Sequence, residues 1–139
     1  MLDDVKIHVK AKISALWASA TLSYLYGDVI GFYSPGGLQK MMDGKMGSWQ
    51  TTQGLLLGVS VVMAFPAVMV VLSLILRAPL SRWLNVAVGL VYTVIMLGTM
   101  VGAWGYGFYF YLYLGVVEVT LTSLIVWYAL TWPRQRVSA

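Results

Sequence analysis

The sequence has no cysteine and only one histidine, and 10% of its 139 residues are charged. The absence of cysteine excludes disulfides, thiol redox relays and thiolate metal sites. Soluble domains usually carry about 25% charged residues, and with 60% hydrophobic residues a soluble fold of this length would leave much apolar surface in water. The composition therefore excludes an ordinary soluble enzyme, a nucleic-acid-binding protein and a disordered chain, and it favours a domain within a lipid bilayer.

Four long apolar segments are separated by turn residues. A bilayer core of about 30 Å needs roughly 20 apolar residues in a helix, and none of the four segments contains Lys or Arg. The sequence predicts an all-α, integral membrane four-helix bundle, formed by a single transmembrane domain over residues 1–139 with an outer loop at residues 33–53. The predicted spans are Ile13–Phe32, Leu55–Leu76, Leu84–Val101 and Phe108–Leu130.

The cations lie mostly on one side of the predicted spans. Seven of the nine Lys and Arg residues precede the first span, separate the second from the third or follow the fourth, whereas Lys40 and Lys45 lie on the other side. Because cytoplasmic loops carry an excess of Lys and Arg, both termini are predicted to be cytoplasmic. The seven are Lys6, Lys10, Lys12, Arg77, Arg82, Arg134 and Arg136.

Small residues recur at every fourth position of the first span and form a small-residue ridge. In lipid, such residues let helix backbones approach closely. We predict that the ridge packs against a crossing helix, in the same chain or in a neighbouring subunit. The ridge consists of Ala11, Ala15, Ser19, Ser23, Gly27 and Gly31.

In the second span, Pro66 predicts a kink, with the carbonyl of Val62 or Met63 bonded by a neighbour or by water.

Glu118 lies at the centre of a predicted span. The midpoint of the fourth span is near residue 119, where an ionised carboxyl costs at least a few kcal/mol. Helical periodicity places Tyr111, Gly115 and Thr122 on the same face, which must point into the bundle. No span contains a cation that could pair with this carboxyl, so the neutral, protonated acid is favoured.

Two interpretations of Glu118 follow from this position. A functional carboxyl would bind a proton or a cation, whereas a structural one would be a neutral acid that joins two helices by hydrogen bonds. The predicted partners at the same depth are Tyr92 in the third span and Thr21 or Ser23 in the first. Ionisable groups inside the membrane mark functional sites by default, and this favours the first interpretation.

Asp28 is the second ionisable residue within a span. Together with Ser14, Trp17, Thr21 and Tyr24 it follows a narrow polar face of the first helix. It lies about 8 Å from the midplane, close enough to the outer interface to stay hydrated. We expect either an interfacial carboxylate near the two lysines of the outer loop or a group at the mouth of a pathway.

The sequence indicates neither catalysis nor a bound cofactor. The spans hold no Cys or His for a nucleophile and base pair and no paired carboxylates at one depth, and a haem held by two histidines is excluded. The outer loop, predicted to be an amphipathic segment on the outer leaflet, has three methionines but no Cys or His to support a copper site. His8 precedes the membrane among lysines and is predicted to be a solvated headgroup contact. No catalytic residue, metal or cofactor is therefore predicted.

Short motifs along nearly the whole chain are similar to those of one family. By these motifs the chain resembles an uncharacterised family of small bacterial four-helix integral membrane proteins, a domain of unknown function. The resemblance implies residence in the bacterial inner (plasma) membrane and implies no activity. Small multidrug exporters are similar in size and also carry a membrane carboxylate, but theirs lies in the first helix. The motifs are Ile13–Trp17, Tyr26–Asp28, Pro35–Leu38, Asp43–Gly47, Thr52–Gly54, Arg82–Asn85 and Trp127–Ala129.

Three functions remain open. The favoured one is a homo-oligomeric, proton- or cation-responsive transporter or channel, because one four-helix chain is too small to enclose a wide aqueous path alone. The second is a binding protein for a lipid-soluble ligand such as a quinone, housed among Trp17, Tyr24, Tyr92 and Tyr111. The third is a structural subunit that assembles through the small-residue ridge. The expected partners are the lipid bilayer, further copies of the chain, and a lipid-soluble or cationic small ligand. The candidate ligand or proton site comprises Glu118, Tyr92, Tyr111, Thr122, Thr21, Asp28 and Tyr24.

Overall fold

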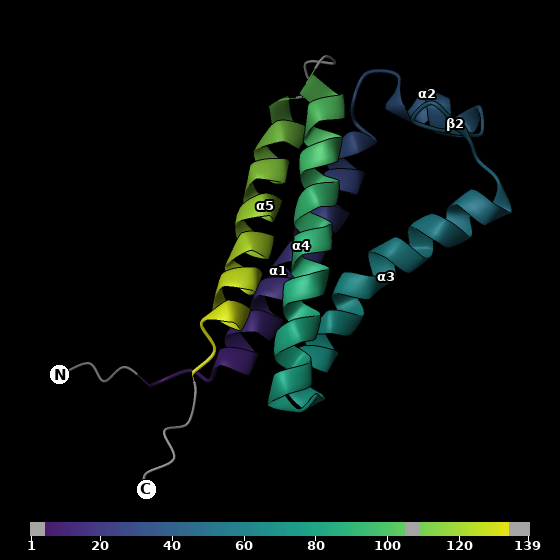
Figure 1. The fold of residues 1–139 in the computed structure, drawn as a ribbon. Helices are drawn as coiled ribbons and strands as arrows, with labels where there is room; N and C mark the ends of the chain where they lie inside the picture. The colour runs from purple at the N-terminus through teal and green to yellow at the C-terminus, as the bar shows by residue number, and fades with distance from the viewer. Residues whose placement is uncertain (1–4, 105–108, 134–139) are drawn as a thin grey trace, which may run out of the picture.

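The structure of the protein is a computed structural model that describes residues 5–104 and 109–133. The fold is built mainly from helices (Figure 1). Four of them are long, and a short helix and a two-stranded antiparallel hairpin connect the first long helix to the second. The all-α class predicted from the sequence is confirmed. The elements are α1 (Val9–Gly31), α2 (Gly37–Met42), β1 (Lys45–Met46), β2 (Trp49–Gln50), α3 (Gln53–Ile75), α4 (Ala78–Ala103) and α5 (Tyr109–Leu130).

Three helices of the described chain, α3, α4 and α5, are long and apolar enough to cross a membrane. Helix α1 has the same length as α3, 23 residues, but Lys10, Lys12 and Asp28 lie within it and lower its mean hydropathy. Crossing by α1 and the cytoplasmic placement of the termini therefore stay predictions. Arg134 and Arg136, which contribute to the predicted orientation, lie outside the described residues, as does Phe108 at the predicted start of the fourth span.

Helices α1, α3 and α4 begin before the apolar runs that predict them. Helix α1 begins four residues before Ile13, because His8 Nδ1 accepts a hydrogen bond from the Lys10 backbone N–H (3.2 Å) and caps the first turn. Helix α4 begins at Ala78, six residues before the predicted span, with Pro79 in its first turn. Hydropathy marks the segment that suits the lipid, whereas caps and proline set where the helix starts.

The bundle is tight on one side and open on the other. Helix α5 packs against both α1 and α4, and α1 packs against α3, whereas α3 and α4 touch little. Figure 1 shows the N-terminal half of α3 diverging from the other helices towards α2 and β2. The buried residues of α3 are Pro66, Met69 and Ser73. The half of α3 that precedes Pro66 thus has little packing within the chain.

Glycines bring α4 and α5 together. A Cβ atom on Gly89 of α4 would lie 2.8 Å from Val126 Cγ2, and one on Gly115 of α5 would lie 2.6 Å from Met100 Cγ. Both distances are too short for real Cβ contacts, so these positions accept only glycine unless the neighbouring side chains move. Helical periodicity predicts Gly115 on the inward face of α5, but it indicates neither glycine as the close contact of this helix pair.

The small-residue ridge of α1 does not make such a contact within the described chain. Ala15 and Ser19 are exposed and Ser23 is half-buried. A Cβ atom on Gly27 would lie at an ordinary 3.6 Å from Leu114 Cδ1, and one on Gly31 would have no neighbour within 4 Å. Of the two predicted partners for the ridge, a tightly crossing helix of the same chain is therefore not found.

The connection between α1 and α3 stands apart from the bundle (Figure 1). It was predicted to be one amphipathic segment, but it contains the six-residue α2 and the hairpin of β1 and β2. Gly36, Gly44 and Gly47 have positive φ angles here, which suits the tight turns. The large apolar side chains of this connection are exposed, namely those of Leu38, Met41, Met42, Met46 and Trp49.

Candidate functional site

A buried polar network joins α1, α3 and α4. The Oδ1 atom of Asn85 accepts hydrogen bonds from Trp17 Nε1 (2.7 Å) and from Ser73 Oγ (3.0 Å). The Nδ2 atom of Asn85 donates to the Ser81 carbonyl (2.7 Å) and lies 3.3 Å from Ser81 Oγ. All four side chains are fully buried. We name this set, Trp17, Ser73, Ser81 and Asn85, the Asn85 network; its polar groups satisfy one another, so its role is to hold three helices together.

Sequence reasoning missed the Asn85 network. Asn85 was predicted only to be part of a family motif, and Trp17 to line a polar face and an aromatic ligand site. A signal was present, because a side-chain amide in an otherwise apolar helix needs hydrogen-bond partners from neighbouring helices. The sequence does not say which helix supplies them, because the packing order of the helices is needed for that.

Helix α5 places Glu118 inside the bundle. Gly115, Glu118 and Thr122 lie on its buried side, and Glu118 is only 3% exposed. Tyr111, predicted to share that face, is half-buried. Near Glu118, Thr93 Oγ1 of α4 lies 2.8 Å from Thr122 Oγ1 and bonds the two helices. The periodicity of α5 therefore brings the Glu118 carboxyl to the interior of the bundle. Its neighbour on the same side of the helix, Thr122, is already hydrogen-bonded to Thr93 of α4.

Two tyrosines and a second carboxyl surround Glu118. The ring of Tyr24 from α1 lies 6.2 Å from that of Tyr92 from α4, which also contacts Trp17 edge-on at 5.9 Å. Glu118 interacts electrostatically with Tyr24 and with Asp28, the exposed carboxyl nearer the end of α1. We name the set of Tyr24, Asp28, Tyr92 and Glu118 the Glu118 cluster.

The two polar groups at the centre of the Glu118 cluster lack partners. Tyr24 is 8% exposed, and its hydroxyl has no hydrogen bond among the described residues. Within the same residues the Glu118 carboxyl also has no hydrogen bond; its backbone carbonyl accepts one from Thr122 Oγ1. Buried polar groups are nearly always paired with protein or water. A buried carboxyl and hydroxyl that the protein leaves unpaired are available to a proton, a water molecule or a ligand.

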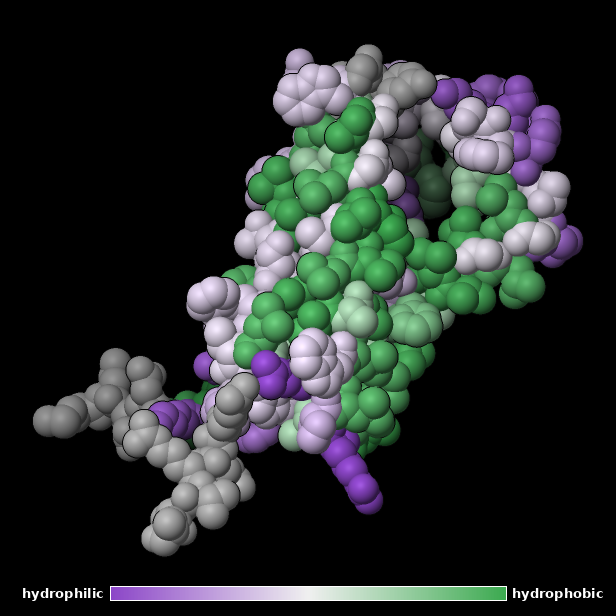
Figure 2. Space-filling view, in the orientation of Figure 1, coloured by the Kyte–Doolittle hydropathy of each residue, from purple (hydrophilic) through white to green (hydrophobic). Residues whose placement is uncertain are grey.

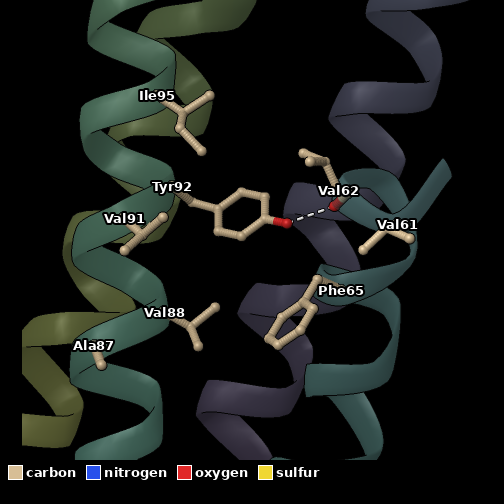
Figure 3. A pocket seen from close by; sticks show the side chains of 8 residues that line it. All are labelled: Val61, Val62, Phe65, Ala87, Val88, Val91, Tyr92 and Ile95. Atoms are coloured by element: carbon tan, nitrogen blue, oxygen red, sulfur yellow. Dashed lines mark hydrogen bonds between the residues drawn. The ribbon is translucent and has the colours of Figure 1, made fainter. Parts of the chain in front are cut away.

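The predicted partners of Glu118 bond elsewhere. The hydroxyl of Tyr92 donates to the Val62 carbonyl of α3, as the dashed line in Figure 3 shows. Thr21 Oγ1 donates to the Trp17 carbonyl within α1 (2.8 Å), as hydroxyls in helices commonly do. The hydrogen bonds that Glu118 was predicted to donate to Tyr92 and Thr21 are not found among the described residues. Ser23, the other predicted partner, is half-buried and forms no hydrogen bond with Glu118 in the described chain.

The bond from Tyr92 has a clear cause in the sequence. Pro66 has no backbone N–H, so the carbonyl four residues earlier, that of Val62, lacks its helical donor. Tyr92 supplies the missing donor from α4. The prediction that a neighbour would bond the carbonyl freed by Pro66 is confirmed for Val62.

An apolar groove lies between α3 and α4, where these two helices touch little. Its volume is about 320 Å³, and Figure 3 shows side chains from the two helices facing each other across it. Tyr92 lines the groove and also belongs to the Glu118 cluster, where its ring lies 6.2 Å from that of Tyr24, so the groove and the cluster share this side chain. The lining residues are Val61, Val62, Phe65, Ala87, Val88, Val91, Tyr92 and Ile95.

The remaining predicted residues lie apart from this centre. Asp28 forms no ion pair with Lys40 or Lys45 in the part of the chain that the structure describes. Tyr111 makes its ring contact with its neighbour Phe110 (6.4 Å). The structure thus brings together Trp17, Tyr24, Tyr92 and Glu118 and leaves Tyr111 at the edge.

The fold and the buried cluster define a small all-helical protein whose apolar helices suit a membrane. The chain belongs to a family of unknown function (DUF6326), which matches residues 4–139. This confirms the membership of an uncharacterised family that the motifs indicated. No curated protein and no solved structure matches the chain. Function must therefore be argued from the geometry of the site.

Proposed function

We propose that this protein is a homo-oligomeric, proton- or cation-responsive transporter or channel of the bacterial inner membrane, with Glu118 as its binding group. The observation that carries the proposal is the carboxyl of Glu118, which is 3% exposed and has no hydrogen bond among the described residues. An unpaired ionised group in a membrane interior costs several kcal/mol. A proton or a bound cation removes that cost, so the occupancy of Glu118 responds to either.

The surroundings of Glu118 suit this role. The rings of Tyr24 and Tyr92 lie 6.2 Å apart and give the site aromatic faces, which attract cations. Asp28 is exposed near the end of α1 and interacts electrostatically with Glu118. A cation or proton that reaches Asp28 first therefore lowers the energy of charging the deeper carboxyl. Asp28 is the proposed entry group and Glu118 the proposed inner group.

Flux through proteoliposomes tests the proposal. A pH gradient is applied across vesicles that contain the protein and a trapped pH-sensitive dye, with and without Na⁺ or K⁺. We expect Glu118→Gln to lower the proton or cation flux at least about tenfold, because the amide keeps the shape but cannot titrate. Asp43→Asn is the matched control, since Asp43 is an exposed carboxyl of the outer connection. Equal fluxes for wild type and Glu118→Gln would refute the proposal.

Assembly through the small-residue ridge is the second element of the proposal. Ala15 and Ser19 are exposed on α1, and small residues at exposed positions allow another helix to approach closely. We expect Ala15→Leu with Ser19→Leu to dissociate the oligomer in cross-linking and light-scattering measurements. Ser60→Leu, at an exposed serine of α3, is the control. Ridge-dependent assembly without any flux would favour a purely structural subunit.

The apolar groove favours a second candidate function, the binding of a lipid-soluble ligand such as a quinone. The groove, of about 320 Å³, is lined by aliphatic side chains and by the rings of Phe65 and Tyr92, which suits a flat apolar ring. Mass spectrometry of gently extracted protein should then find a co-purified ligand. Ala87→Leu, within the groove, should reduce its amount, and Ala67→Leu, exposed outside it, should not. Protein that carries no such ligand would exclude this function.

A further inference from the structure

A second cavity lies at the end of the bundle where α1 and α4 begin and α5 ends. Its volume is about 620 Å³, and it is separate from the Glu118 cluster, which lies near the middle of α5. None of its described lining residues is acidic. Those that matter for its chemistry are His8, Lys10, Arg82, Trp83 and Trp132. The cavity therefore combines cations with two large aromatic rings.

Lys10 and His8 are fixed on one side of this cavity. Lys10 Nζ donates to the carbonyls of Leu74 (3.1 Å) and Leu76 (2.6 Å) at the end of α3. An ammonium group has three donors, so one N–H remains for an anion. His8 Nδ1 accepts a hydrogen bond from the Lys10 backbone N–H (3.2 Å). In the neutral ring the proton is consequently on Nε2, which is then a further donor.

Arg82 is fixed on the other side. Its Nε donates to the carbonyl of Ala129 (3.1 Å) and its Nη2 to that of Leu130 (3.2 Å), at the end of α5. The guanidinium also lies 5.4 Å from the ring centre of Trp83. A guanidinium has five N–H donors, so these contacts hold the group in place without using all of them. Such a pre-positioned cation loses little conformational entropy when it binds an anion.

The start of α4 adds to the positive character of the cavity. Ala78, the first residue of α4, lines the cavity. The N-cap residue, Arg77, makes no side-chain capping bond, and the first turn contains no acidic residue. Among the described residues, the free N–H groups of this first turn and the positive end of the helix dipole are thus not neutralised by a side chain, although Pro79 contributes no N–H.

We infer that this cavity binds the phosphate group of an anionic membrane lipid. Phosphate accepts several hydrogen bonds and is recognised by Arg, Lys and helix N-termini. Tryptophan rings prefer the headgroup level of a bilayer, and basic pockets between membrane helices hold anionic headgroups. Trp83 and Trp132 thus place the cavity at the depth where lipid phosphates lie. The site is independent of Glu118 and of the proposed flux.

Thermal unfolding in detergent with added lipid tests the inference. We expect phosphatidylglycerol to raise the unfolding midpoint of the wild type by about 4 °C more than an equal amount of phosphatidylcholine. In Arg82→Gln this difference between the lipids should fall below about 1 °C. Because the two lipids are compared within each variant, loss of the contact between Arg82 and α5 does not imitate the result. Arg77→Gln, at the same end but outside the cavity, should keep the full difference.

Three outcomes would overturn the inference. The first is an equal unfolding midpoint for the wild type in the two lipids. The second is an equal loss of the difference between the lipids in Arg77→Gln and Arg82→Gln. The third is a rise of the midpoint with millimolar inorganic phosphate as large as that with phosphatidylglycerol, which would make a soluble phosphate the occupant. Native mass spectrometry of wild-type protein from an equal lipid mixture keeps the test open if Arg82→Gln does not fold. Phosphatidylglycerol should be retained at least about threefold over phosphatidylcholine, and equal retention would overturn the inference.

Discussion

The Asn85 network and the pair of Tyr24 and Glu118 at the centre of the Glu118 cluster are both polar, both buried between α1 and its neighbours, and opposite in their hydrogen bonding. Asn85 accepts from Trp17 and Ser73 and donates to Ser81. Glu118 and Tyr24 have no such side-chain partner among the described residues. The first set is complete without any other molecule, and the second is not.

This difference separates stability from function within one small bundle. A satisfied network gains free energy from every bond and loses it when one member is removed. An unsatisfied pair reduces stability, and a water molecule, ion or ligand that binds there offsets this cost. We therefore expect substitutions in the Asn85 network to change the free energy of unfolding, and substitutions in the Glu118 cluster to change flux or binding with little effect on stability.

The largest effect on stability is expected from Asn85→Leu. The substitution keeps the number and branching of the side-chain heavy atoms but leaves Trp17 Nε1 and the Ser73 hydroxyl without their buried acceptor. Each lost bond costs about 0.6 kcal/mol on average in a membrane protein, and stranded groups add to this. We expect a loss of roughly 2–3 kcal/mol in the free energy of unfolding, measured by SDS titration in mixed micelles.

The control for Asn85→Leu is Ser60→Ala. Ser60 is exposed on α3, and its hydroxyl bonds only to the Leu56 carbonyl of the same helix (2.8 Å). Its loss should cost less than about 0.3 kcal/mol. If Asn85→Leu costs no more than this control, the Asn85 network is not a stabilising tie and the comparison with the Glu118 cluster fails.

Tyr92 belongs to the Glu118 cluster but has a structural bond, so it should behave like a member of the Asn85 network. Tyr92→Phe removes the donor to the Val62 carbonyl and should cost about 1 kcal/mol of unfolding free energy. Pro66→Ala restores the helical N–H that this carbonyl lacks. In the Pro66→Ala background, Tyr92→Phe should therefore cost less than about 0.5 kcal/mol. Equal costs in the two backgrounds would show that Tyr92 does not act through Val62.

The sequence predicts the fold class, the helices and the inward position of Glu118 because these follow from local periodicity. Hydropathy locates the apolar runs, and a 3.6-residue repeat fixes which side of α5 holds Glu118 and Thr122. Pro66 likewise predicts that the Val62 carbonyl needs a donor, because the missing N–H is a local property of the helix.

The bonded pairs could not be predicted in the same way. Tyr92 and Thr21 share the depth of Glu118, but depth does not determine which way a hydroxyl points, and each found a backbone carbonyl instead. The Asn85 network depends on α1 and α3 both reaching Asn85 of α4, which is a matter of helix order. Gly89 similarly becomes a close contact only because α5 lies against that side of α4.

Glu118→Gln should change stability little. The carboxyl has no side-chain hydrogen bond among the described residues, so an amide of the same size breaks none. We expect the free energy of unfolding to change by less than about 0.5 kcal/mol, while the flux falls as proposed. A destabilisation as large as that of Asn85→Leu would show that Glu118 is a helix-joining acid. The Asn85 network and the Glu118 cluster would then both serve to stabilise the bundle.

Tyr24→Phe is the one substitution in either polar set that is expected not to lower stability. It removes one buried hydroxyl that lacks a partner and keeps the ring that lies against Tyr92. Removing an unsatisfied polar atom avoids its desolvation cost, so stability should stay the same or rise by up to about 1 kcal/mol. Trp17→Phe is the contrasting variant, since it removes a paired N–H of the Asn85 network and should lower stability. If Tyr24→Phe lowers the free energy of unfolding as much as Trp17→Phe does, the Tyr24 hydroxyl is bonded in the membrane. The water molecule or ligand that bonds it can then be sought by comparing the wild type with Tyr24→Phe.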